Sequence, residues 1–293
     1  YPKWMRDIAD TQDPETGAIA DTAPYRWGRR PADPVDACYL KIPWLLYTHF
    51  GDTETMTEHY PGMRAWVEFL AANTEEHIVQ YSHYGDWSPP MSEGTPGSMG
   101  QGAVSARTPG KLISTAYYAT CCRLLARMAA IVGEEGDSSH YAARADEIVR
   151  AYNHAFWDEQ AGGYGSNNQA CNAISLALDL VPTDRVQRTV ASLVAAVEAH
   201  DWHLTTGNQC TKYLLEALSE HGHVDAAYRI ATRTDYPSWG YMLANGATTI
   251  WERWEFAKEG GMHSHNHPMH GAIGAWYFKH LLGIRPAEDG SGF

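Results

Sequence analysis

The sequence is short of positive charge and of long apolar runs. Lysine and arginine number 22 against 35 aspartates and glutamates, a formal net charge of −13, and such a charge repels phosphate backbones and anionic lipid surfaces. No window approaches the roughly 20 continuous apolar residues of a membrane-spanning helix, and no basic region followed by an apolar stretch comes after Tyr1. We therefore expect a soluble chain without nucleic acid or membrane partners, in a compartment that the sequence leaves open.

Motifs for metal, nucleotide or acyl-transfer chemistry are also scarce. The chain has no phosphate-binding glycine loop of the P-loop type and no Gly-x-Ser-x-Gly nucleophile motif. Its cysteines are scattered without C-x-x-C spacing, which favours reduced, buried thiols over a disulfide framework or a zinc site. The five cysteines are Cys38, Cys121, Cys122, Cys171 and Cys210.

Aromatic residues are abundant, with 11 Trp and 17 Tyr. Several lie beside Gly, Pro or Asp in expected loops, notably Trp27, Trp87 and Trp239. Flat aromatic faces in loops suit the apolar faces of sugar rings, and neighbouring carboxylates and amides suit the hydroxyls. Carbohydrate is therefore the expected ligand class.

Helical periodicity dominates the rest of the chain, and good strand patterns are few. We predict one domain over residues 1–286, followed by a linker or tail over residues 287–293. The expected helices, eleven in number, cover residues 1–12, 34–49, 55–77, 108–132, 137–157, 169–180, 183–200, 208–221, 223–234, 246–257 and 266–282.

Short links join consecutive expected helices at Asp52, Pro182 and Gly222, as helix hairpins require. Pairs recur every 40–50 residues or so, which is typical of helical repeats and toroids. A closed six-hairpin α/α barrel needs twelve helices, so we expect the missing one to precede Tyr1. The long polar loop over residues 82–107 is expected to be functional or disordered.

Glu252 is the strongest catalytic candidate. Inverting glycosidic cleavage needs a protonated carboxyl and a carboxylate base roughly 6.5–9.5 Å apart, in aromatic-lined positions. Glu252 lies between Trp251 and Trp254, one turn into the helix expected after Gly246. An ordinary surface glutamate of that helix is the alternative.

Two aspartates are weaker candidates. Asp86, in Gly85-Asp86-Trp87 at the mouth of the long loop, can bind sugar hydroxyls or hold a water, or can simply form the turn. Asp36 precedes an expected helix start, where capping explains an aspartate as well as function does.

Four of the 15 histidines form a cluster near the C-terminal end of the chain. Their i, i+2 and i+4 spacing suits a transition metal, but the cluster contains no carboxylate or cysteine ligand, so we expect no metal. A sugar contact by His267, at a helix entry, is the favoured interpretation. The four residues are His263, His265, His267 and His270.

The chain resembles the catalytic domain of bacterial α-L-rhamnosidases, glycoside hydrolase family 78, over nearly its whole length. The specific stretches are Pro237-Ser-Trp-Gly-Tyr-Met, Gly246-Ala-Thr-Thr-Ile-Trp-Glu and Asn266-His, in this order. The resemblance implies an all-α, six-hairpin α/α barrel and hydrolysis of terminal α-L-rhamnosides with inversion. It implies Glu252 as the general base, His267 as a sugar contact, Trp27, Asp86 and Trp87 as pocket residues, and no cofactor.

The family's general acid belongs to an Asp-Cys-Pro-Gln-Arg-type segment that this chain lacks. It would fall before Tyr1, together with the missing helix and further domains that we expect to be β-rich. Residues 29–34 look like an insertion before Asp36, which leaves the role of Asp36 open. Another helical-barrel enzyme (an unsaturated glucuronyl hydrolase, an epimerase or a lyase) and a non-catalytic carbohydrate-binding domain remain the alternatives.

Overall fold

The computed structural model describes residues 1–25, 31–35, 37–96, 103–256 and 263–287. Within these residues helices dominate, and the strands form two antiparallel hairpins of two-residue strands. The predicted all-α class is therefore confirmed. In the first hairpin β1 (Thr74–Glu75) pairs with β2 (Ile78–Val79), and in the second β3 (Trp157–Asp158) pairs with β4 (Gly163–Tyr164).

The described part of the chain contains eleven α-helices, some of them short, and three brief helical turns of other types. None of these helices combines the length and the apolar character needed to cross a membrane. The α-helices are α1 (Pro2–Asp10), α2 (Cys38–Phe50), α3 (Glu54–Ala72), α4 (Gly110–Val132), α5 (Glu135–Phe156), α6 (Gln169–Ala177), α7 (Thr183–Glu198), α8 (Thr211–Glu220), α9 (Val224–Ala231), α10 (Trp239–Ala244) and α11 (Ile273–Trp276). The other turns are η1 (Met91–Glu93), η2 (Met269–Ala272) and the π-helical η3 (Tyr277–Leu281).

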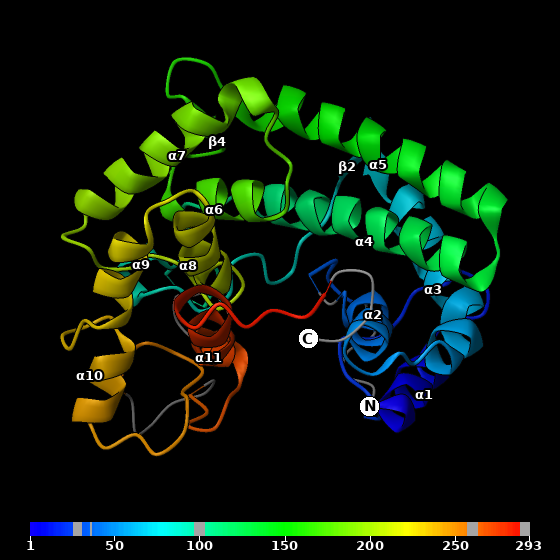
Figure 1. The fold of residues 1–293 in the computed structure, drawn as a ribbon, viewed down its shortest axis with the longest axis horizontal. Helices are drawn as coiled ribbons and strands as arrows, with labels where there is room; N and C mark the ends of the chain where they lie inside the picture. The colour runs from blue at the N-terminus through cyan, green and yellow to red at the C-terminus, as the bar shows by residue number, and fades with distance from the viewer. Residues whose placement is uncertain (26–30, 36, 97–102, 257–262, 288–293) are drawn as a thin grey trace. The chain divides into compact units, whose positions relative to one another are not determined.

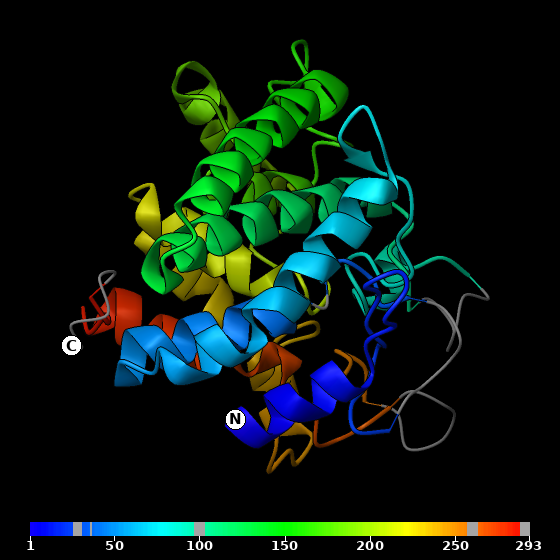
Figure 2. The same ribbon diagram turned by 90° about the vertical axis from the view of Figure 1, so that its right-hand side faces the viewer.

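The chain divides into two compact units, of which the first comprises Tyr1–His83, Ser114–Tyr152 and the described part of Arg285–Phe293. In this unit α1 packs against α2 and α3 (Figure 2). Gly51, with a φ of 68°, ends α2 in the left-handed region that favours glycine. The Asp52 carboxylate then accepts the Thr55 N–H at 2.9 Å and its hydroxyl at 2.7 Å, which satisfies the first turn of α3.

The second unit comprises Tyr84–Ile113 and Asn153–Ile284. Here α6 packs against both α7 and α8, and α8 packs against both α9 and α11 (Figure 1). This alternation is the helix-hairpin pattern that the link residues predict. Pro182 directly precedes α7, and Gly222, with a φ of 84°, lies between α8 and α9.

The predicted helix over residues 246–257 is wrong. The helix in this region is α10, which begins after Ser238, whose hydroxyl oxygen accepts the Tyr241 N–H at 2.9 Å. Residues 247–256 are not helical. Their backbone bonds instead to a later segment, with the Glu252 N–H donating to Ser264 O and the His267 N–H to Ile250 O, both at 2.8 Å. The β-branched run from Thr248 to Ile250 loses side-chain freedom in a helix, which disfavours the predicted helix at this point.

The long polar loop is partly ordered by its own backbone. Around η1, the Thr95 N–H donates to Val104 O at 2.7 Å and the Ala106 N–H donates to Glu93 O at 2.8 Å. The predicted helix over residues 266–282 is present as η2, α11 and η3 in succession, starting at Met269.

Candidate active site

Four segments of the second unit meet around the expected catalytic residues. They are the start of the long loop (residues 84–91), the turn before α8 (206–210), the segment after α10 (247–256) and the segment before α11 (263–270). The first two segments are joined by the Asn208 N–H, which donates to Trp87 O at 2.7 Å. The last two are joined by the backbone hydrogen bonds of Glu252 and His267 described above. The Trp254 ring N–H joins the two pairs by donating to Thr206 O at 3.1 Å.

Asp86 is buried and fastens the long loop to α8. One carboxylate oxygen accepts the Gly207 N–H at 2.7 Å and the other accepts the Cys210 N–H at 2.9 Å. Gly207 is required at this close approach, because a Cβ there would lie 2.3 Å from Trp87 O. Burial raises the pKa of Asp86 to about 6, and the two backbone N–H groups act in the opposite direction. The carboxylate therefore holds Trp87 in place, whereas its contact with a sugar stays a prediction.

Trp87 is positioned by Tyr84, which contacts its ring, and by Asn208, which binds its backbone carbonyl. Its ring packs edge-on against Tyr84, with centroids 5.3 Å apart, and its carbonyl is held by Asn208. The side chain is largely buried. Its backbone and ring are therefore fixed before any ligand binds.

Glu252 is buried in the segment that bonds to residues 264–267. Its Oε2 accepts the Ser264 N–H at 3.1 Å, so the carboxylate is oriented by the backbone. Within the described part of the chain its Oε1 takes part in no hydrogen bond. One oxygen is thus fixed and the other remains available as an acceptor.

Glu255 connects the segment after α10 to the long loop at Met91 and to Tyr236, before α10. Its Oε1 accepts the Tyr236 hydroxyl at 2.6 Å and the Met91 N–H at 2.7 Å, and its Oε2 accepts the guanidinium of Arg253 at 3.2 Å. The Arg253 side chain is almost fully buried. These residues were not predicted from the sequence. The run Trp251-Glu-Arg-Trp-Glu255 is a local signal for Arg253 and Glu255, whereas none exists for Tyr236 or Met91.

An aromatic cluster lies beside Glu252. Trp239 packs edge-on against Trp254, with centroids 5.2 Å apart, and its ring N–H donates to His270 O at 3.0 Å. The His270 ring lies 4.0 Å from that of Trp254. Burial lowers the pKa of His270 to about 3, so this imidazole is neutral at working pH. Trp239 is therefore near Glu252 but largely buried.

The histidines of the C-terminal cluster occupy different environments. His265 stacks on Trp251 at 4.5 Å, whereas His267 is half-buried and its Nδ1 accepts the Met269 N–H at 3.5 Å. No group of three or more metal-ligating side chains forms a candidate metal site among the described residues. The backbone N–H of His267 donates to the carbonyl of Ile250, and Ile250 precedes Glu252 by two residues in the sequence.

Two of the predicted binding residues, Trp27 and Asp36, lie outside the described residues. The others, Asp86, Trp87, Trp239, Glu252 and His267, all belong to the second unit.

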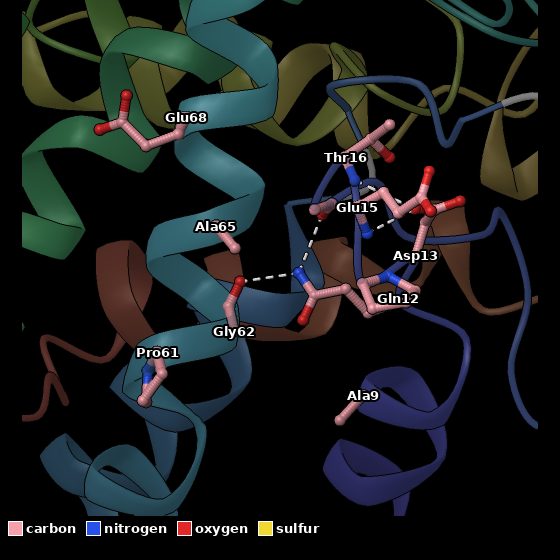
Figure 3. A pocket seen from close by; sticks show the side chains of 11 residues that line it. Ala9, Gln12, Asp13, Glu15, Thr16, Pro61, Gly62, Ala65 and Glu68 are labelled. Atoms are coloured by element: carbon pink, nitrogen blue, oxygen red, sulfur yellow. Dashed lines mark hydrogen bonds between the residues drawn. The ribbon is translucent and has the colours of Figure 1, made fainter.

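A polar cavity of about 520 Å³ belongs to the first unit, away from all of these residues in sequence. It lies between α3 and the turn after α1, where the Gln12 amide donates to Gly17 O and Gly62 O, both at 2.8 Å (Figure 3). The Asp13 carboxylate accepts the backbone N–H groups of Glu15 and Thr16, which closes the turn. No aromatic side chain lines this cavity, so it lacks the surface expected of a sugar site.

Asp86 predicts a pH dependence of stability. Burial raises the pKa of Asp86 from 3.8 to about 6. Between these two pH values the folded state therefore keeps a proton on Asp86 that the unfolded state has lost. Its contribution to the free energy of unfolding therefore falls as the pH rises from about 4 to about 6, by about 3 kcal/mol, and is constant above that range. Urea unfolding of wild type and Asp86→Asn across this range should show wild type losing stability relative to the variant. If the unfolding free energy of wild type minus that of Asp86→Asn stays constant or increases with pH, the raised pKa is contradicted.

The chain is similar to alpha-L-rhamnosidases over most of its length. A model of the bacterial alpha-L-rhamnosidase 6 hairpin glycosidase domain matches residues 1–281. An alpha-L-rhamnosidase of Streptomyces avermitilis is 34% identical over 98% of this chain and 27% of its own length. The structure of alpha-L-rhamnosidase from Dictyoglumus thermophilum is similar with a TM-score of 0.87 and 37% identity over 95% of this chain and 31% of that one. A Streptomyces avermitilis alpha-L-rhamnosidase structure complexed with L-rhamnose has a TM-score of 0.83 and 31% identity, over 97% of this chain and 27% of that one. The chain thus spans less than a third of the length of each of these relatives.

Proposed function

Because this chain belongs to the bacterial α-L-rhamnosidase six-hairpin glycosidase family, we propose that it is the catalytic core of an inverting glycoside hydrolase that releases L-rhamnose from terminal α-L-rhamnosides. The solved relative that is complexed with L-rhamnose supports this substrate class.

The state of the Glu252 carboxylate carries the proposal. Its Oε2 is held by the Ser264 N–H, and its Oε1 is bonded to no described residue. A general base needs this combination, a fixed carboxylate with one oxygen free to accept a proton from water. The water oxygen attacks the anomeric carbon as its proton passes to Oε1, and the bond to the leaving oxygen breaks.

The leaving oxygen takes a proton from a second carboxyl group on the opposite face of the sugar. We assign this general acid to a part of the polypeptide outside residues 1–293, because the Asp-Cys-Pro-Gln-Arg-type segment is absent from this sequence. The relatives are more than three times as long as the part that matches this chain, which leaves ample polypeptide to supply it.

We propose that the remaining predicted residues form the sugar pocket. Trp87 supplies an apolar face and is held by Asp86 through the turn before α8. His267 supplies a hydrogen-bonding group, and Trp239, Trp27 and Asp36 complete the set. The proposed mechanism requires no cofactor.

The test is hydrolysis of a chromogenic α-L-rhamnoside by the full-length protein, with the first-formed sugar anomer followed by NMR. We expect release of the chromophore and β-L-rhamnose as the first product, because inversion converts the α-linkage to the β-anomer. An α-anomer formed first would exclude the inverting mechanism. Binding of L-rhamnose without turnover would favour a carbohydrate-binding domain instead.

A further inference from the structure

Glu255 is the point at which three segments of the second unit meet. Its Oε1 accepts the Tyr236 hydroxyl at 2.6 Å and the Met91 N–H at 2.7 Å, while its Oε2 accepts the guanidinium of Arg253 at 3.2 Å. The Met91 nitrogen also lies 3.2 Å from the Tyr236 hydroxyl oxygen, so these groups form one cluster. The mechanism proposed above assigns no role to any of them.

The contacts of Glu255 are charged and largely shielded from water. The Arg253 side chain is 2% exposed and that of Glu255 is 14% exposed. Hydrogen bonds to an ionised acceptor are about twice as strong as those between neutral groups. Burial and the hydrogen bond to Glu255 raise the pKa of Tyr236, so its hydroxyl stays protonated and remains a donor. The cluster is therefore able to fix one backbone segment against another.

Glu255 joins the segment of the proposed base to the segment of Trp87. Glu252 precedes Glu255 by three residues, and Trp87 precedes Met91 by four. Each of the two segments also has its own attachment. The turn before α8 holds the Trp87 backbone, and the segment before α11 holds the Glu252 carboxylate. These attachments orient each side chain, but they do not set the distance between the two.

A second link lies next to Glu255 in the sequence. The Trp254 ring N–H donates to Thr206 O at 3.1 Å, in the turn that holds Trp87. One link lets a segment rotate about it, whereas two links at different points restrict that rotation. The proposed reaction needs this restraint, because the water lies between Glu252 and a sugar placed against Trp87. A misplacement of about 1 Å can cost about 10²-fold in rate.

We propose that Glu255 is a positioning residue, which sets the distance between the Glu252 carboxylate and the Trp87 ring through its hydrogen bond with the Met91 N–H. It acts through Glu252 rather than on the substrate. This inference rests on the proposed function, with Glu252 as base and Trp87 as sugar contact. Its loss should lower kcat with little change in KM, because Trp87 keeps its own attachment to the turn before α8 and still binds the sugar.

Removal of the Met91 N–H tests this role and leaves the ion pair of Glu255 with Arg253 in place. Met91→Pro deletes the donor, and proline suits the position because Met91 begins η1 and Pro90 before it has a ψ of 142°. Met91→Ala is the matched variant, which loses the same side chain, 51% exposed, but keeps the N–H. In the full-length protein we expect kcat of Met91→Pro on a chromogenic α-L-rhamnoside to be at least about tenfold below that of Met91→Ala, with KM within about threefold. Equal kcat values would overturn the proposal.

The Glu252→Gln background separates positioning from a general effect on the fold. With the base removed, no proton acceptor is left to align, so Met91→Pro should lower kcat by less than about twofold relative to Met91→Ala in that background. A loss by the same factor in both backgrounds would mean that the hydrogen bond supports the fold or the sugar pocket as a whole. That result would overturn the proposal.

Glu255→Leu tests the acceptor itself, since leucine offers no oxygen to the Met91 N–H. We expect a loss of at least about tenfold in kcat, to which Met91→Pro should add less than about twofold, because its N–H has already lost its partner. Wild-type kcat in a variant shown to be folded by circular dichroism would overturn the proposal. If this variant does not fold, because Arg253 is left buried and unpaired, the Met91 variants still decide.

The wild-type rate distinguishes the two levels of the argument. If the full-length wild-type protein hydrolyses no rhamnoside, the proposed function fails and this inference fails with it. An active wild type in which Met91→Pro matches Met91→Ala overturns the positioning role of Glu255 alone.

Discussion

The Glu252→Gln variant of the full-length protein is expected to lose about 10³-fold in kcat with little change in KM, within the range typical of a lost general base. Glutamine keeps the shape of the side chain, and its carbonyl oxygen can still accept the Ser264 N–H that holds Oε2. It cannot accept the proton of the attacking water. Initial rates on a chromogenic α-L-rhamnoside give both constants, and Glu198→Gln on the exposed face of α7 is the control that should retain wild-type rates.

Azide separates a catalytic role of Glu252 from a structural one. In Glu252→Ala the small side chain leaves space for an anion that needs no deprotonation to act as a nucleophile. Azide should restore turnover and give the β-L-rhamnosyl azide, with the leaving oxygen still protonated by the general acid. A variant that is folded but not rescued, or Glu252→Gln with wild-type kcat, would contradict the assignment of Glu252 as base.

Residues 1–293 alone are expected to hydrolyse rhamnosides at least about 10²-fold more slowly than the full-length protein, because the proposed mechanism takes its general acid from outside these residues. The measurement is kcat/KM for both proteins on the same rhamnoside. The loss should be largest for substrates with poor leaving groups, since these depend most on protonation of the leaving oxygen.

The shorter chain must be shown to be folded for this comparison to hold. Circular dichroism should give a mainly helical spectrum, and L-rhamnose titration by NMR reports on the pocket. A folded chain with activity within about tenfold of the full-length protein would mean that both carboxyl groups lie within residues 1–293.

Part of the site was accessible to sequence reasoning, for identifiable reasons. Glu252, Trp87 and Trp239 stand out because acids and aromatics lie together in short motifs beside turn residues. The partners of Glu255 do not stand out in this way. Tyr236 is 19 residues from Glu255 and Met91 is 164 residues away, so no local pattern reports these contacts.

The sequence by itself determined the helical class, the positions of most helices and the links at Asp52, Pro182 and Gly222, because helix periodicity, caps and turn glycines act over a few residues. Only the tertiary structure decided that Glu252 lies outside any helix and that the Asp86 carboxylate is bound to the turn before α8. The Ser264 N–H that orients Glu252 is 12 residues away, and the Gly207 N–H that holds Asp86 is 121 residues away. Such hydrogen bonds depend on how distant segments pack, and they override the local preference of a short run such as residues 246–257.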